Sequence, residues 1–149
     1  VPHHEDFNFG SGPFTITSWV QMFLAPLGMP QHIIGKRSTQ EDNYIHLIRR
    51  NGDFIWGFRG GHTIQTTTNI YDDGTWHFVA ISRDAAGEAT FFLDGRHVSR
   101  DLPYDVSNAA PFTMGNREGT GERFTGAIDD VRIYNKALSI EELTGVMNR

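Results

Sequence analysis

Paired carboxylates are the residues to consider first, because two of them on one strand face could hydrolyse a glycosidic bond by acid–base chemistry. Glu118 and Glu122 stand in a glycine-containing segment that reads as a loop, and Glu141 and Glu142 open a predicted helix. The chain has no cysteine, which excludes a thiol nucleophile, a Cys-ligated zinc and disulfides. The sequence therefore predicts a protein that is not an enzyme.

The seven histidines are the side chains best suited to a transition metal. His3 and His4 are adjacent, so a strand would point them to opposite faces. The other five are far apart and show no His-x-His spacing: His32, His46, His62, His77 and His97. His46 shares the parity of Tyr44 along a predicted strand, which favours a buried, hydrogen-bonded histidine over a metal ligand.

A β-hairpin is predicted over residues 44–59, because Asn51-Gly52 between two apolar runs is a strong turn signal. Phe54, Trp56 and Phe58 share one face of its second strand and are expected in the core. The opposite face is expected to point outward and to carry these residues: Ile45, Leu47, Arg49, Ile55, Gly57 and Arg59. Arg49 and Arg59 could then donate paired hydrogen bonds to a uronate or a sulfate.

Three further residues are candidates for binding a sugar. Tyr71 and Tyr104 fall in predicted turns, where a ring can stay exposed and pack on the C–H face of a sugar, and His62 follows Gly60-Gly61. Charge supports an anionic ligand, since residues 31–62 carry a net charge of +2 within a chain of net charge −5. The alternative is that these charges are only solvated groups on strands and turns.

The elements that would position these side chains are short strands separated by turn signals, with no helix between them. Residues 14–21 alternate with a period of two, and Asp73-Gly74 and Asp94-Gly95 mark further turns. This pattern predicts an all-β protein, an antiparallel two-sheet sandwich with a jelly-roll architecture. A single short C-terminal helix is expected to begin near Ser139, where Ser139-Ile-Glu-Glu142 forms a capping box. A length of 149 residues fits one domain, 1–149.

Four motifs in this order resemble the bacterial laminin-G-like domain of the concanavalin A-like lectin/glucanase superfamily. They are residues 14–20 (FTITSWV), 76–82 (WHFVAIS), 92–95 (FLDG) and 126–138 (GAIDDVRIYNKAL). The resemblance covers nearly the whole chain and implies a jelly roll in which Trp19, Trp76 and Phe92 are packing residues. The family usually has a strand before residues 2–7, so the chain is expected to be a domain excised from a larger protein, with most of that strand missing and one sheet edge less covered.

The resemblance also implies a metal. Ile128-Asp-Asp-Val-Arg-Ile-Tyr134 looks like the strand that binds calcium in related jelly rolls, where its carboxylate joins backbone carbonyls. Asp129 would then be a ligand of a structural Ca²⁺ ion. The alternative is that Asp129 is a surface carboxylate paired with an arginine.

The function that the resemblance implies is binding rather than catalysis. Related glucanases carry Glu-x-Asp-x-x-Glu and related alginate lyases carry Gln-(Ile/Val)-His, and neither motif is present here. We therefore expect a secreted or cell-surface carbohydrate-binding module that targets a parent enzyme or surface protein to a polysaccharide or oligosaccharide. The alternative is a structural or protein-interaction module for adhesion. Nucleic acid is not an expected partner, because the net charge is negative, and no apolar run is long enough to span a membrane.

Overall fold

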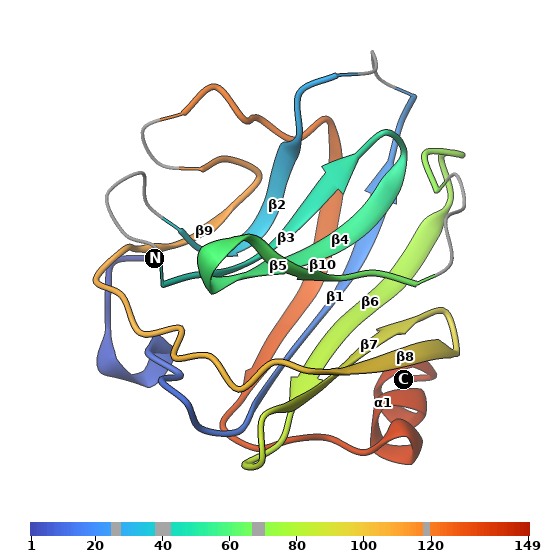
Figure 1. The fold of residues 1–149 in the computed structure, drawn as a ribbon. Coiled ribbons are helices and arrows are strands. Elements are labelled where there is room, and N and C mark those ends of the chain that lie inside the picture. The colour runs from blue at the N-terminus through green and yellow to red at the C-terminus, as the bar shows by residue number, and fades with distance from the viewer. Residues whose placement is uncertain (25–27, 38–42, 67–70, 118–119) are drawn as a thin grey trace.

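Two five-stranded antiparallel sheets form the protein, as the jelly-roll prediction requires (Figure 1). The structure is a computed structural model that describes residues 1–24, 28–37, 43–66, 71–117 and 120–149. Sheet A has the order β10-β1-β6-β7-β8, and sheet B has the order β5-β4-β3-β2-β9. The strands of sheet A are β1 (Phe14–Met22), β6 (Trp76–Arg83), β7 (Glu88–Leu93), β8 (Arg96–Asp101) and β10 (Gly126–Tyr134). Those of sheet B are β2 (Gln31–Lys36), β3 (Ile45–Arg50), β4 (Asp53–Phe58), β5 (His62–Ile64) and β9 (Phe112–Met114).

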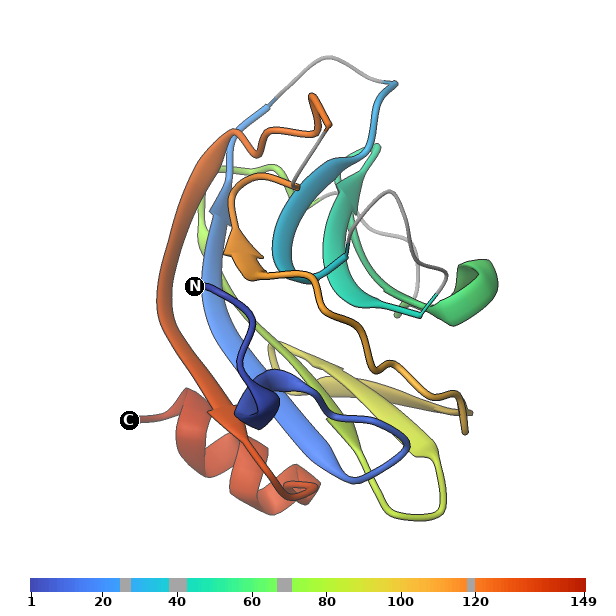
Figure 2. The same cartoon turned by 90° about the vertical axis from the view of Figure 1, so that its left-hand side faces the viewer.

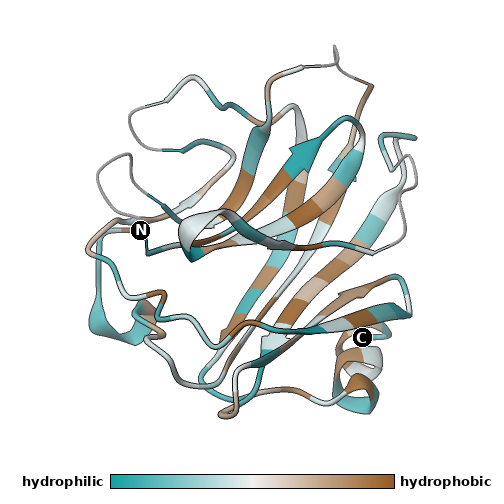
Figure 3. Cartoon of the chain, in the orientation of Figure 1, coloured by the Kyte–Doolittle hydropathy of each residue, from teal (hydrophilic) through white to brown (hydrophobic). Residues whose placement is uncertain are grey.

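The hydrophobic core lies between the facing surfaces of the two sheets. Phe14, Ile16 and Val20 alternate along β1 and are fully buried there, together with Phe54 and Trp56 from β4. Figure 3 shows the same pattern, with hydrophobic segments along the strands and hydrophilic residues at the turns and on β8. The hydrophobic residues that alternate along the sequence are therefore those on the inward face of each strand.

The faces of the β3–β4 hairpin differ from the prediction. Phe54, Trp56 and Phe58 are in the core as expected, but Arg49 lies directly opposite Phe54 and Leu47 directly opposite Trp56. Residues opposite each other in an antiparallel pair share a face. Ile45, Leu47 and Arg49 therefore point into the core, and the outward direction predicted for these three side chains is wrong. The outer face of β3 carries instead His46 and Ile48.

The C-terminal helix α1 (Ile140–Met147) covers part of the outer face of sheet A (Figure 2). The predicted capping box is confirmed: Ser139 Oγ accepts from the Glu142 amide, and the Glu142 carboxylate accepts from the Ser139 amide. Leu143 and Val146 pack on Phe78 and on other residues of β6 and β7. No helix among the described residues is long and apolar enough to cross a membrane.

The N-terminal residues run along the edge of sheet B and include a single 3-10 turn, η1 (Glu5–Phe7). The Val1 amino group donates to Phe112 O at 2.8 Å, and the Phe112 amide donates to Val1 O at 3.0 Å. Val1 thus forms strand-like hydrogen bonds with β9, which is the edge strand of the sheet.

Candidate functional site

Three of the predicted sugar-binding residues gather around the short 3-10 turn η2 (Arg59–Gly61) between β4 and β5. The rings of His62 and Tyr104 stack with centroids 4.2 Å apart and planes 12° apart. Arg59 is exposed at the start of η2. Its charge reaches Asp105, the residue after Tyr104: hydrogen bonds from Ser107 lower the pKa of Asp105, and the charge of Arg59 adds to that effect. Gly60 has φ of 67°, a value that glycine adopts without strain, and it turns the chain there.

Two residues that the sequence analysis did not select lie next to this turn. The guanidinium carbon of Arg37 lies 4.1 Å above the centre of the Tyr44 ring, and the Tyr44 hydroxyl accepts from the Gly61 amide at 3.0 Å. Tyr44 therefore connects Arg37 to η2. We call Arg37, Arg59, His62 and Tyr104 the η2 surface; Tyr44 is buried and supports Arg37. The net charge of +2 over residues 31–62 was the one signal in the sequence that pointed to Arg37.

A pair of buried histidines lies next to Arg37 on the outer face of sheet B. Arg37 Nη1 donates to His46 Nε2 at 2.9 Å, and the rings of His46 and His32 are 5.6 Å apart. Burial lowers the pKa of His32 to about 4, and burial followed by the charge of Arg37 lowers the pKa of His46 well below its usual range. Both rings are therefore neutral at pH 7 and leave the positive charge of this region to the arginines.

Arg49 and Tyr71 are not part of the η2 surface, which corrects their predicted exposure. Arg49 is 2% exposed, and its Nη2 atom lies 2.7 Å from Oδ2 of Asp72, which is 4% exposed. Tyr71 is 8% exposed, its ring packs on Phe54 at 5.5 Å, and its amide donates to Gly52 O. The segment containing Tyr71 and Asp72 thus closes over the tip of the β3–β4 hairpin and gives the buried arginine its partner.

Asp129, the predicted calcium ligand, lies on sheet A, opposite Trp19. Its side chain is exposed, and its Oδ1 atom accepts from the Asp130 amide at 2.8 Å. The neighbouring Asp130 carboxylate accepts from Arg132. Within the described ranges, no three His, Asp or Glu side chains gather around one point. A calcium ion here would therefore rely on Asp129 and on backbone oxygens.

Calcium binding by Asp129 stays a prediction. We expect calcium to raise the melting midpoint relative to a chelator, by about 2–4 °C for each kcal/mol of binding free energy. Asp129→Asn should remove this response, while Asp130→Asn should keep most of it. Equal midpoints of the wild type with calcium and with chelator would contradict the prediction.

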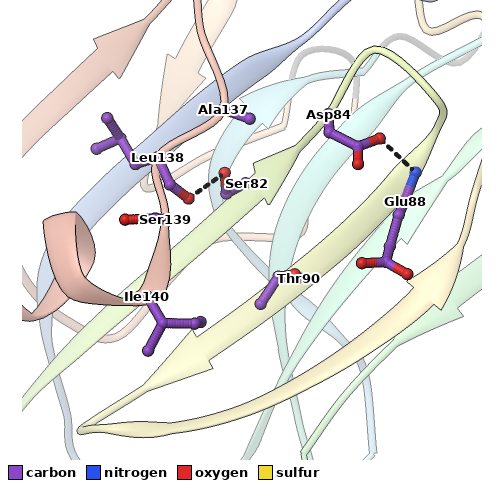
Figure 4. Close-up of a pocket in the computed structure, with 8 residues that line it drawn as sticks. All are labelled: Ser82, Asp84, Glu88, Thr90, Ala137, Leu138, Ser139 and Ile140. Atoms are coloured by element: carbon purple, nitrogen blue, oxygen red, sulfur yellow. Dashed lines mark hydrogen bonds between the residues drawn. The ribbon is translucent and has the colours of Figure 1, made fainter.

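A shallow pocket of about 320 Å³ lies on sheet A beside the start of α1 (Figure 4). Ser82 and Thr90 line its floor, and the segment 137–140 forms one wall. Its polar groups are already used within the protein, since Ser82 Oγ donates to Leu138 O at 2.9 Å and Asp84 Oδ1 accepts from the Glu88 amide. These hydrogen bonds hold the connection to the helix in place, and they leave few polar groups of the pocket for a ligand.

Residues 1–144 match the family described as the concanavalin A-like lectin/glucanases superfamily, laminin G type. The chain belongs to this family. One curated relative is the adhesion G-protein coupled receptor V1 of Danio rerio, which is 28% identical over 98 residues. That alignment covers 62% of this chain and only 2% of the receptor, so the chain spans a very small part of its relative.

Solved structures with a similar fold include a binding domain of a toxin and a CBM40 module of a sialidase. The binding domain of Paraclostridial Mosquitocidal Protein 1 has a TM-score of 0.78 at 19% identity, over 99% of this chain and 40% of that one. The CBM40 module of the Ruminococcus gnavus IT-sialidase, bound to α2,3 sialyllactose, has a TM-score of 0.74 at 17% identity, over 93% and 84% of the two chains. At these identities the likeness establishes the fold.

Proposed function

We propose that this laminin G-type domain is a non-catalytic carbohydrate-binding module that takes an acidic oligosaccharide at the η2 surface. The observation that carries the proposal is the stack of the His62 and Tyr104 rings at the end of η2, the turn that begins with the exposed Arg59. A guanidinium donates two parallel hydrogen bonds to a carboxylate or sulfate, and an aromatic ring packs against the C–H face of a sugar. The sialidase module bound to sialyllactose supports this ligand class.

The setting that we propose is extracellular, on a parent enzyme or surface protein that the module directs to a glycan. The family and the adhesion receptor relative support this setting. The same relative favours the second candidate function, a protein-interaction module for adhesion. The two functions can be distinguished by titration. A carbohydrate-binding module binds a free oligosaccharide saturably, and an adhesion module does not.

The test compares two ligands that differ by one acidic sugar, α2,3 sialyllactose and lactose, by calorimetric titration at two salt concentrations. We expect sialyllactose to bind modestly, to weaken with salt, and to lose about tenfold in affinity in Arg59→Ala, because a charged hydrogen bond is lost. Arg50→Ala is the matched control, since Arg50 is exposed at the other end of the same hairpin.

An affinity for sialyllactose that changes neither with salt nor in Arg59→Ala would contradict the proposed site. If sialyllactose does not bind, oligogalacturonate is the second acidic probe, because it presents a carboxylate on every ring. Failure of both probes would favour the adhesion function.

A further inference from the structure

The outer face of sheet A carries a second exposed aromatic surface, far from the η2 surface. The Trp19 and Phe78 rings meet on this face with centroids 5.4 Å apart, next to the residues that α1 covers. Trp76 and Gln21 lie two residues further along β6 and β1, so they share the face. Figure 2 shows that the strands continue beyond the helix, which leaves this end of the face uncovered.

Two aromatic rings are exposed at that uncovered end. Trp76 is 43% exposed and Phe23 is 46% exposed, although the resemblance to the family implied that Trp76 is a packing residue. Phe23 lies beside Gly74, where a Cβ atom would be 3.9 Å from the ring. Gly74, in the turn before β6, thus places no side chain against the ring. Large exposed rings are costly in water, and a cluster of them marks a binding surface.

A polar group sits between the two rings. Gln21 pairs with Trp76 on one side and with Ala127 on the other, and its Nε2 atom donates to Gly74 O at 2.7 Å. This bond joins β1 to the turn before β6 and orients the amide. The amide oxygen of Gln21 takes no part in this bond and can accept a hydrogen bond from a ligand. We call Gln21, Phe23 and Trp76 the aromatic platform.

The charges next to the aromatic platform decide which ligand it suits. Asp73 precedes Gly74 and bonds the ring of His77 at 3.1 Å, and Asp129 lies exposed on β10 two residues from Ala127. The titratable groups nearest to the platform are therefore these two carboxylates and the His77 imidazole that pairs with the first of them. Carboxylates repel an anionic sugar and accept hydrogen bonds from hydroxyl groups. Flat rings around a fixed amide suit a pyranose, whose C–H face packs on the ring while its hydroxyls bond at the edge.

We propose that the aromatic platform is a second ligand site, which binds a neutral oligosaccharide through stacking on Trp76. This site is independent of the η2 surface and has the opposite ligand preference. Its binding should be nearly insensitive to salt, because no ion pair with the ligand forms. A module with both sites would hold a polysaccharide that has neutral and acidic stretches at two points.

The experiment titrates the protein with neutral tetrasaccharides of β-1,4-linked glucose, xylose and mannose, read by calorimetry and by tryptophan fluorescence. Trp56 is fully buried and Trp19 is half-buried, so the exposed Trp76 should contribute most of any shift to shorter wavelength when a sugar covers it. The loss of this shift in Trp76→Ala assigns it. We expect at least one probe to bind and Trp76→Ala to weaken it by about tenfold or more. Trp76→Phe should bind within about threefold of the wild type, because the ring is kept.

Met114→Ala is the matched control, since Met114 is 49% exposed on sheet B and its loss should change nothing. Arg59→Ala should also leave the neutral probes unaffected. The proposal is overturned if none of the three probes binds the wild type, or if Trp76→Ala binds like the wild type with an unchanged melting midpoint. Neither result would change the binding of sialyllactose at the η2 surface, so each of the two proposals can be contradicted without the other.

Discussion

Replacing Arg49 with alanine is expected to lower the free energy of unfolding by about 3–5 kcal/mol. The guanidinium is buried between the sheets and pairs with Asp72 at 2.7 Å, and both side chains are almost fully inaccessible. Removing the arginine leaves the Asp72 carboxylate buried without its counter-charge. Asp72 Oδ1 already has no hydrogen-bond partner among the described residues, so the carboxylate would have little else to stabilise it.

Urea unfolding followed by circular dichroism measures this effect, and Arg50→Ala is the control. Arg50 is exposed one residue further along β3, so its loss should cost less than about 0.5 kcal/mol. The double variant Arg49→Leu, Asp72→Leu should recover much of the loss, because two apolar side chains replace a buried ion pair at little cost. A loss below about 1 kcal/mol in Arg49→Ala would show that the pair is not buried in solution.

Acid is expected to destabilise the protein through His32 as the pH falls from 6.5 to about 4. The ordinary pKa of histidine is 6.5, and burial lowers that of His32 in the folded protein to about 4. Between pH 6.5 and about 4, His32 is protonated in the unfolded chain and neutral in the folded protein. The contribution of His32 is therefore fully present above pH 6.5 and is lost as the pH falls to about 4, by roughly 3 kcal/mol. His46 acts in the same direction.

Other groups act in the opposite direction, so the comparison must isolate His32. Burial raises the pKa of Asp53 to about 6, and a hydrogen bond to Asp94 raises that of His77; both contributions to stability are lost as the pH rises. The measurement is the difference in unfolding free energy between the wild type and His32→Gln from pH 7.5 to 4.5. Glutamine keeps a partner for Thr113, which bonds His32 Nε2 at 3.0 Å. A difference that stays constant with pH would contradict the assignment.

The direction of Arg49 shows where the sequence analysis failed for an avoidable reason. Phe54, Trp56 and Phe58 were placed correctly in the core, but a two-residue Asn51-Gly52 turn puts residue 49 opposite residue 54. The turn type that predicted the hairpin also determines this register, so the inward direction of Arg49 could have been derived. Its partner Asp72 could not, because no local pattern predicts that residues 71–72 close over the turn.

For the candidate site too, the features that depend on neighbouring residues could be predicted from the sequence, and those that depend on distant residues could not. The capping box at Ser139 and the glycine turn before His62 depend on neighbouring residues and were visible in the sequence. The stack of His62 on Tyr104 joins residues 42 positions apart, and the exposure of Trp76 depends on where α1 ends on sheet A. Composition identified rings and charges as candidates, but only the packing of distant segments decides which of them reach the surface.

The pairing of β1 with β10 has a consequence for how the protein is made. Thr15 pairs with Tyr134, and its hydroxyl donates to Lys136 O, 121 residues along the chain. A ribosome must therefore release nearly the whole domain before β1 can gain its second neighbour. Closing so long a loop makes folding slow, on the scale of milliseconds to seconds for all-β proteins. Until then β1 keeps an unpaired edge, which makes the unfinished chain a substrate for chaperones and prone to aggregation.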